Sequence, residues 1–308
     1  MQPPLSDPDV FESCVLRGAH AAPDAPPRLL IEAPHGATLP THYARLAARL
    51  RGNLPDGLEI FFFVNTDVGS WEYGLRTAQR LVEADPTLVV WALRSLVPRT
   101  FVDCNRFADA PAGDLTRGGL TAGIPTYIQN PDDRARLLDL HGRYVSAVSS
   151  AVDAVCGAGG LALIPHTYGP VSLGIPVVDE QIVHRLRAAH EPAVYATWPM
   201  RPEIDVLTRD LEGRSWCPEG MEAALLAGFA AAGFAAAANQ TYQLHPATLG
   251  HRWSTRWPGH VVTLEVRRDL LVPAWRPFEE MQVDAASVDR VAAVLASVLR
   301  PHLSAPAA

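Results

Sequence analysis

The chain has 308 residues, of which 48% are hydrophobic and 19% are charged, and its formal net charge is −7. This balance predicts a globular protein with a substantial core, and the lack of a basic run argues against a nucleic-acid partner. The longest apolar stretch, residues 223–238, is too short and too rich in alanine for a membrane span, so we expect a buried helix there and no membrane partner.

Short apolar strands alternate with helices rich in alanine and leucine. In chain order the sequence predicts a strand at 28–36, a helix at 41–52 between Thr41 and Gly52, a strand at 58–67, a helix at 71–85 capped by Ser70, a strand at 87–93, a helix at 134–156, and strands at 160–167 and 259–268. Such alternation favours an α/β fold with a mixed, mostly parallel central sheet flanked by helices.

We expect one catalytic domain over residues 1–308, with an N-terminal extension at 1–27 and lid or substrate-loop insertions within 170–258. Residues 1–14 lack the basic start and apolar core of a signal peptide, so the expected location is cytoplasmic. The cysteines are widely spaced and form no CxxC pair, which predicts free thiols at Cys14, Cys104, Cys156 and Cys217.

Polar side chains follow four of the predicted strands. His35 follows LLIEAP, Asp67 follows FFFVNT, Asn105 and Arg106 follow TFVDC, and His166 follows LALIP. Ligands of parallel sheets collect at the carboxyl ends of strands, so we expect these side chains to lie close together. Their types suit a metal ion or an anion.

The segment 98–106, PRTFVDCNR, reads as a buried strand that carries charges. Burying such charges is costly unless they are paired or bound. We interpret Arg106 and Asn105 as residues that bind an anionic group, and Arg99 as a residue that stabilises an oxyanion. The alternative is an internal ion pair between Arg99 and Asp103.

Glu265 lies inside the apolar run VVTLEV, where a carboxylate needs a partner. Two imidazoles and one carboxylate would leave a zinc position open for water, and a further carboxylate could take the proton of that water. The pattern therefore favours a metal-assisted hydrolase. Structural histidines, a turn-capping aspartate and an edge-strand glutamate are the competing interpretations, because no compact HExxH motif joins the candidates.

Several segments resemble, in order, motifs of the N-formylglutamate amidohydrolase family, which is related in fold to the zinc carboxypeptidases and aspartoacylases. The clearest resemblance is that of RTFVDCNR to the family's arginine followed by V(I/V)D(L)NR. The others are EAPHGAT at 32–38, NTDVGSWEYG at 65–74, LIPHTYG at 163–169, NQTYQLHPATLGH at 239–251 and GHVVTLEVRR at 259–268, with a looser match of DLHGRY at 139–144. The resemblance spans about residues 28–270.

Carried over by position, this resemblance implies that His35, Asp67 and His166 bind one zinc ion, with Glu72 as the alternative to Asp67. His141 would lie beside the ligands. Other divalent metals suit the same ligand set.

The resemblance also implies catalytic and substrate-binding groups. Glu265 would be the general base and acid, and Arg99 would stabilise the tetrahedral oxyanion. Recognition of the substrate would fall to Asn105 and Arg106, which bind its carboxylate, and to Asn239 and Tyr242, which line the substrate side.

The chain departs from the family pattern in two places. Ile164 and Pro165 precede His166 where the family has an aspartate, so we expect a different orientation of this histidine. The family's glycine pair is replaced by an aromatic and basic loop that contains His245, Arg252, Trp253, Arg256 and Trp257. We interpret it as a loop suited to a larger or differently shaped acyl group, or as a surface flap.

The sequence thus predicts a zinc-dependent amidohydrolase of carboxypeptidase-like fold. Its partner would be a small-molecule N-acyl amino acid or a peptide-like substrate that carries a carboxylate. A catalytically silent small-molecule-binding protein of the same fold and a peptide-trimming metallocarboxypeptidase are the alternatives. The acyl group, the amine and the oligomeric state are left open.

Overall fold

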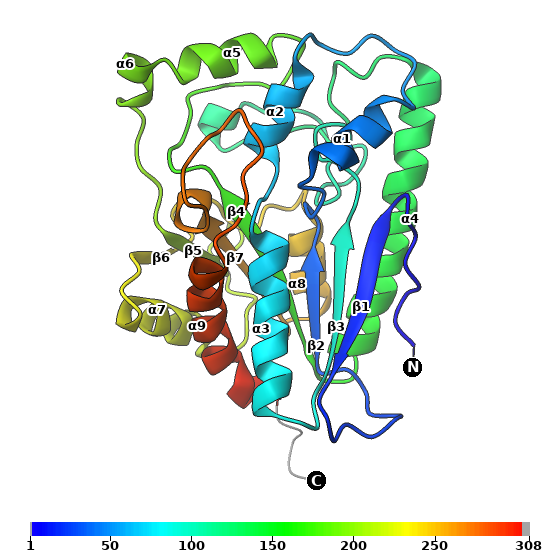
Figure 1. Ribbon diagram of the computed structural model, residues 1–308, viewed down its shortest axis with the longest axis vertical. Helices are drawn as coiled ribbons and strands as arrows, with labels where there is room; N and C mark the ends of the chain where they lie inside the picture. Colours follow the sequence, from blue (N-terminus) through cyan, green and yellow to red (C-terminus); the bar gives the residue numbers. More distant parts are fainter. Residues whose placement is uncertain (1, 304–308) are drawn as a thin grey trace.

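The most apolar segments of the chain form the centre of a mixed seven-stranded sheet, which the computed structural model describes within residues 2–303 (Figure 1). Its strand order is β1-β3-β2-β4-β7-β5-β6. The strands are β1 (Phe11–Arg17), β2 (Leu29–Ala33), β3 (Val89–Ser95), β4 (Leu161–Tyr168), β5 (Ile204–Leu207), β6 (Ala236–Ala238) and β7 (Val261–Arg267).

Most neighbouring strands of the sheet run parallel, and only the pairs β1/β3 and β5/β7 are antiparallel. Every residue of β2 and β4 is buried, as expected of central strands covered on both faces. The predicted mixed, mostly parallel sheet flanked by helices is confirmed.

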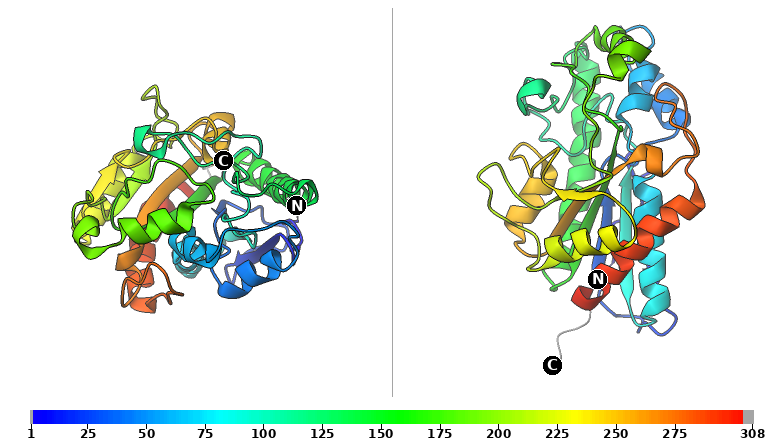
Figure 2. Two further views of the ribbon diagram at one scale, coloured as in Figure 1. Left: turned by 90° about the horizontal axis from the view of Figure 1, so that it is seen from above. Right: turned by 90° about the vertical axis from the view of Figure 1, so that its left-hand side faces the viewer.

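Helices cover both faces of the sheet (Figure 2). One face packs against α3 (Ser70–Ala84), α7 (Met221–Ala231) and α9 (Ala285–Leu303), and the other against α4 (Pro131–Cys156) and α8 (Leu249–Arg256). Near the carboxyl ends of β2, β3 and β4 lie α1 (Pro40–Ala47), α2 (Leu58–Asn65), α5 (Ile182–Ala189) and α6 (Pro192–Tyr195). Short 3-10 turns occupy Leu115–Arg117 and Arg268–Leu270.

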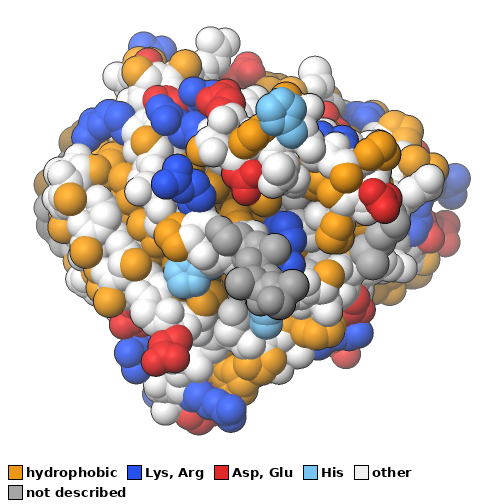
Figure 3. All heavy atoms as spheres, turned by 90° about the horizontal axis from the view of Figure 1, so that it is seen from below, with side chains coloured by type: hydrophobic (Ala, Val, Ile, Leu, Met, Phe, Trp, Pro, Cys, Tyr) orange, Lys and Arg blue, Asp and Glu red, His pale blue; other side chains and the backbone are white. Residues whose placement is uncertain are grey.

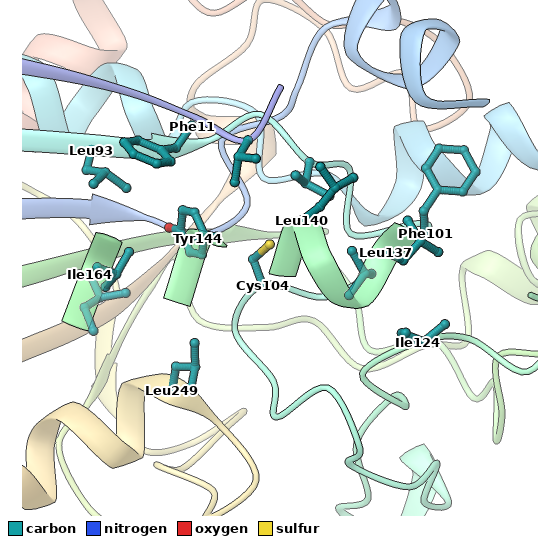
Figure 4. Packing of buried hydrophobic residues seen from close by; sticks show 14 of the residues in the cluster. Phe11, Leu93, Phe101, Cys104, Ile124, Leu137, Leu140, Tyr144, Ile164 and Leu249 are labelled. Carbon is teal, nitrogen blue, oxygen red and sulfur yellow. The ribbon is translucent and has the colours of Figure 1, made fainter. Parts of the chain in front are cut away.

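The long helix α4 begins with a clear cap and ends beside the sheet. The Asn130 side chain accepts hydrogen bonds from the backbone N–H groups of Asp132 and Asp133, and Pro131 occupies the first helical turn. Figure 4 shows Tyr144 of this helix beside Cys104, which belongs to the segment after β3. The core between α4 and the sheet therefore anchors the back of that segment.

Helix α3 lies unusually close to the sheet at Gly74. A Cβ atom on this residue would come within 2.8 Å of Ile31 Cγ2 on β2 and 3.2 Å of Pro165 Cγ on β4. The glycine thus sets the spacing of helix and sheet, and with it the position of the residues just before α3.

Several predicted elements differ from the structure. Residues 58–65 form α2 instead of a strand, and their uniformly apolar sequence explains the error, because a short apolar run does not distinguish the two states. The segment 98–106 is a series of turns, opened by a hydrogen bond from Phe101 N to Pro98 O of 3.0 Å. The apolar stretch 223–238 divides between α7 and the edge strand β6.

The predicted helix boundaries also need correction. Helix α1 begins at Pro40 and ends at Ala47, so Thr41 lies within it and Gly52 beyond it. Ser70 is the first residue of α3, and its cap position is taken by Gly69 at φ 92°. The chain thus enters the helix from a left-handed residue, and the capping propensity of Ser70 does not reveal this geometry.

The predicted extension and insertions contribute to the same sheet. Residues 1–27 include β1, and residues 170–258 include β5 and β6. Within residues 2–303, none of the helices has the length and apolar character needed to cross a membrane. On the face shown in Figure 3, at the amino ends of the parallel strands, charged and hydrophobic side chains are interspersed.

Candidate metal centre and active site

A cavity of about 390 Å³ opens at the carboxyl ends of the central strands. The elements that reach it include the turn after β2, the end of α2, the segment after β3, the strands β4 and β7, and the loops around α5 and α8. Of the sequence-predicted site residues, His35, Asp67, Arg99, Asn105, Arg106, His166, Tyr242 and Glu265 line this cavity.

Three of these side chains form a buried cluster compatible with a metal site. Asp67 Oδ2 lies 3.1 Å from His35 Nδ1 and 3.0 Å from His166 Nδ1, and each of the three residues is at most 4% exposed. One potential ligand atom from each lies within 4.8 Å of the others. The structure therefore brings the three predicted ligands together, although Asp67 follows a helix and not a strand.

The surroundings keep Asp67 ionised. Burial alone would raise the pKa of its carboxyl group, but His35, His166 and the Arg99 guanidinium together hold this pKa well below its usual range. A permanently charged carboxylate beside two imidazoles is the form that binds a divalent cation.

His35 also contacts Asp103, which the sequence suggested only as a possible ion-pair partner of Arg99. His35 Nε2 lies 2.7 Å from Asp103 Oδ1, so both nitrogens of this ring face carboxylates. A neutral imidazole donates only one proton, and the other contact needs a second proton or a cation. A metal ion at Nδ1, with Nε2–H donating to Asp103, satisfies both contacts.

The donor set fits zinc. Two imidazoles and one carboxylate are a common set of protein ligands at catalytic zinc sites. Glu72, the predicted alternative to Asp67, is not in the cluster; it lies in the first turn of α3, half-buried, and burial raises its pKa. Among residues 2–303, its Oε2 atom has no hydrogen-bond partner.

His166 presents Nδ1 to Asp67 as His35 does, but its second ring nitrogen has a different neighbour. Within the described residues 2–303 its Nε2 atom has no ion-pair partner, and it lies 3.4 Å from the side-chain nitrogen of Asn105. The side-chain oxygen of Asn105 accepts a hydrogen bond of 3.1 Å from Gly250 N at the start of α8. Ile164 and Pro165, which precede this histidine on β4, offer it no carboxylate.

Arg99 is paired and still reaches the cavity. Its Nη2 donates to Asp103 Oδ2 at 2.9 Å, and its Nη1 lies 3.5 Å from Asp67 Oδ1. Burial opposes the charge of this guanidinium, but the two carboxylates more than compensate and raise its pKa. The predicted ion pair with Asp103 is therefore present, and 22% of the Arg99 side chain remains exposed toward the cavity.

Arg106 is a buried cation with little compensation. Its Nε lies 3.9 Å from Asp103 Oδ2 and has no hydrogen-bond partner within the described residues 2–303. Burial lowers the pKa of its guanidinium although Asp103 opposes this effect. His141 Nε2 donates to the Arg106 carbonyl oxygen at 2.8 Å, so His141 supports this loop and does not contact the histidine cluster. Such a poorly compensated cation on a cavity wall suits an anionic ligand.

Glu265 lies next to the cluster on the neighbouring strand. It is directly opposite His166 in the parallel pairing of β7 with β4. Its Oε2 is buried and unpartnered in the part of the chain that the structure describes. Burial raises the pKa of this carboxyl group to about 7, with a further contribution from Asp67 that His166 and the arginines oppose. A group with this pKa can both accept and return a proton near neutral pH.

The two predicted residues of the substrate side have different surroundings. Tyr242 lines the cavity and is 39% exposed. Asn239 does not line it: its side-chain oxygen accepts hydrogen bonds from the backbone N–H groups of Thr208 and Arg209, at 2.9 Å each. Its own φ of 56° explains why asparagine, which tolerates the left-handed region, occupies this turn after β6.

Most of the predicted aromatic and basic loop is helix α8. Trp253 is fully buried in α8, and Trp257 Nε1 donates to Asp153 Oδ1 at 2.9 Å. Only His245 of this group lines the cavity. The helical spacing of Leu249 and Trp253, four residues apart, is the sequence signal for a buried helix face that was overlooked.

Two further arginines line the cavity without having been predicted. Arg201 is held between the Tyr168 and Tyr242 rings and donates to the Tyr242 hydroxyl at 3.1 Å. Arg268 donates to Val64 O at 2.8 Å at the end of α2, and burial lowers its pKa to about 10. Among the described residues neither forms an ion pair with a carboxylate; Arg201 Nε donates to Ser172 Oγ, and Arg268 Nη1 donates to Phe63 O. Arg268 follows a strand and was detectable by the strand-end rule; Arg201 had no such signal.

Comparisons with known proteins agree with the geometry. Residues 76–272 match the family model of N-formylglutamate amidohydrolase. The chain is similar to the crystal structure of N-formylglutamate amidohydrolase from Ralstonia eutropha JMP134, with a TM-score of 0.54 and 16% identity over 96% of this chain and 98% of that chain. At this identity the likeness establishes the fold alone.

Two other solved structures match with lower TM-scores. A gene product of Agrobacterium tumefaciens gives a TM-score of 0.49 and 18% identity over 94% of each chain. A metallo-carboxypeptidase from Burkholderia cenocepacia gives 0.44 and 11% identity over 94% of this chain and 60% of that chain. None of the curated proteins matches this sequence.

Proposed function

This chain belongs to the N-formylglutamate amidohydrolase family, and from that premise we propose that it hydrolyses the amide bond of an N-acyl amino acid with one divalent metal ion, preferably zinc. The metal would be held by His35, Asp67 and His166. The observation that carries this proposal is the buried cluster of these three side chains beside the unpartnered carboxylate of Glu265 in one cavity.

Zinc bound at this cluster would acidify a water molecule and polarise the scissile carbonyl group. Side chains of the protein perform the remaining steps. Glu265 takes the proton from the attacking water and later delivers it to the departing nitrogen. Burial raises the pKa of this carboxyl group in the metal-free protein, which favours proton uptake. Its position opposite His166 places the carboxylate next to the cluster without using it as a ligand.

Arg99 and Arg106 each stabilise a different negative charge, the developing oxyanion and the substrate carboxylate respectively. Arg99, anchored by Asp103, presents a fixed guanidinium to the oxyanion that develops at the carbonyl oxygen. Arg106 binds the substrate carboxylate, with Asn105 beside it, and the incoming anion supplies the partner that its Nε lacks. Asp103 contributes by orienting His35 and Arg99 at the same time.

The proposal is tested by Glu265→Gln on a panel of N-formyl and N-acetyl amino acids, with release of the free amine as the assay. We expect the variant to bind metal as wild type does and to lose about 10²- to 10⁴-fold in kcat. Glu72→Gln is the matched control and should keep both metal and turnover, since Glu72 lies outside the cluster. Equal turnover by Glu265→Gln and wild type would remove Glu265 from the mechanism.

A further inference from the structure

The cavity has an apolar wall in addition to the polar groups of the proposed catalytic site. Segments that are far apart in sequence supply it: Phe61 and Val64 of α2, Ile175 and Val178 of the loop after β4, and Ile182 and Leu186 of α5. Figure 1 shows α2 and α5 above the carboxyl ends of the central strands. This set of six residues is called the apolar wall below.

The apolar wall is shielded from bulk solvent and yet borders open space. Ile182 and Leu186 are 1% and 2% exposed, and Ile175 and Val178 are 8% exposed. Protein interiors have few voids larger than a water molecule, because an empty apolar cavity is destabilising. Cavities of about 300 to 1,000 Å³ that combine apolar walls with convergent polar groups are instead typical of small-molecule sites, and the volume here is about 390 Å³.

Neighbouring contacts hold the wall in place. Arg185 on α5 donates to both carboxylate oxygens of Asp179, at 2.6 and 2.9 Å, and to Val177 O at 3.2 Å. These bonds fix the start of α5 against the loop that carries Val178. A rigid wall costs a ligand less ordering than a mobile one, so the wall is suited to bind apolar groups.

A formyl group is too small and too polar to cover such a wall. We propose that the substrate carries a bulky apolar substituent of several carbon atoms, which contacts the apolar wall while its carboxylate lies at Arg106 and its amide at the histidine cluster. This inference rests on the proposed function. The substituent belongs either to the acyl group or to the amino-acid side chain, and the experiment separates these two sources.

The first measurement is kcat/KM of the zinc-loaded wild-type protein for two series of compounds. One series lengthens the acyl chain from formyl to hexanoyl on a single amino acid, and the other keeps the formyl group and enlarges the side chain from alanine to leucine and phenylalanine. In one of the series kcat/KM should rise about fourfold per added methylene until the wall is covered. Flat or falling values in both series would overturn the inference.

Substitutions in the apolar wall test whether these residues cause the rise of kcat/KM with apolar length. Leu186→Ala and Val178→Ala should each reduce, about tenfold, the ratio of kcat/KM for the best long substrate to that for its formyl or alanine counterpart. Val183→Ala on the same helix is the matched control, because Val183 does not line the cavity, and it should leave the ratio unchanged. Circular dichroism identifies the folded variants. An unchanged ratio in the folded wall variants would contradict the inference.

Calorimetric binding to Glu265→Gln separates failure of the inference from failure of the proposed function. Affinity that rises with apolar length, without turnover by wild type, would support the inference and reject the hydrolase. Turnover of N-formyl compounds with no effect of length in either assay would keep the hydrolase and reject the inference. Absence of both binding and turnover would reject both.

Discussion

Asp103 connects the proposed metal site with the arginines, and replacing it by asparagine isolates the role of its charge. One carboxylate oxygen, Oδ1, accepts from His35 Nε2 at 2.7 Å and from Asn105 N at 2.8 Å. The other, Oδ2, accepts from Arg99 Nη2 at 2.9 Å. In the variant, an amide oxygen can replace Oδ1, but the NH2 group then faces the guanidinium of Arg99, and both are donors.

The expected magnitude follows from these contacts. Loss of the carboxylate that supports a ligating histidine lowers metal affinity about 10- to 100-fold. Loss of one partner of a buried ion pair costs about 3 to 5 kcal/mol. Asparagine keeps the bonds at Oδ1, so we expect the free energy of unfolding of metal-free protein to fall by about 3 kcal/mol, the lower end of that range.

Zinc affinity is measured by competition with a chromogenic chelator, and stability by urea unfolding of the metal-free protein. Asp133→Asn is the matched control. Asp133 is also buried and accepts hydrogen bonds from two backbone N–H groups, those of Arg51 and Gly52, but it lies outside the cavity. It should lose stability and keep zinc affinity. Wild-type zinc affinity in Asp103→Asn would refute the role of Asp103 at His35.

Three more results are expected. In steady-state kinetics, Arg106→Ala should raise KM for N-acyl amino acids more than tenfold and lower kcat less. Arg106→Lys should not restore KM, because lysine cannot bind a carboxylate with two parallel hydrogen bonds. An unchanged KM in Arg106→Ala would mean that the carboxylate binds elsewhere. Burial raises the pKa of Glu32 from 4.5 to about 7, so the folded state holds its proton and wild type loses stability as pH rises from about 4.5 through 7. Glu32→Gln should remove this loss, with a gain over wild type of roughly 3 kcal/mol at pH 8 and little at pH 4 in urea unfolding; an equal gain at both pH values would contradict it. Gly74→Val should cost about 1 to 3 kcal/mol in the same assay, because α3 has no room above Ile31, and wild-type stability would show that the helix can move outward.

The sequence was informative about the site where a simple topological rule applied. His35 and His166 lie where strand ends were expected to place them, and the predicted mixed sheet and family are confirmed. Asp67 was placed beside them for a wrong reason, since the segment before it is helix α2. A run such as IFFFV has no periodicity to separate helix from strand, and tertiary packing decides between them.

The contacts that the sequence did not reveal depend on side-chain geometry. Asp103 was recognised only as a possible ion-pair partner of Arg99, whereas it also bonds His35, which is 68 positions away in the chain. Arg201 reaches the cavity from a loop with no motif, between two tyrosine rings. No local sequence pattern predicts such contacts, because they form only when distant segments pack together.

Elemental analysis of the purified protein beside its His35→Ala and His166→Ala variants tests the central claim most directly. The account predicts about one equivalent of zinc in wild type after zinc is supplied, and its loss in both variants while circular dichroism shows that they remain folded. Wild type that binds no metal, or folded variants that retain a full equivalent, would contradict the assignment of the metal site to His35, Asp67 and His166.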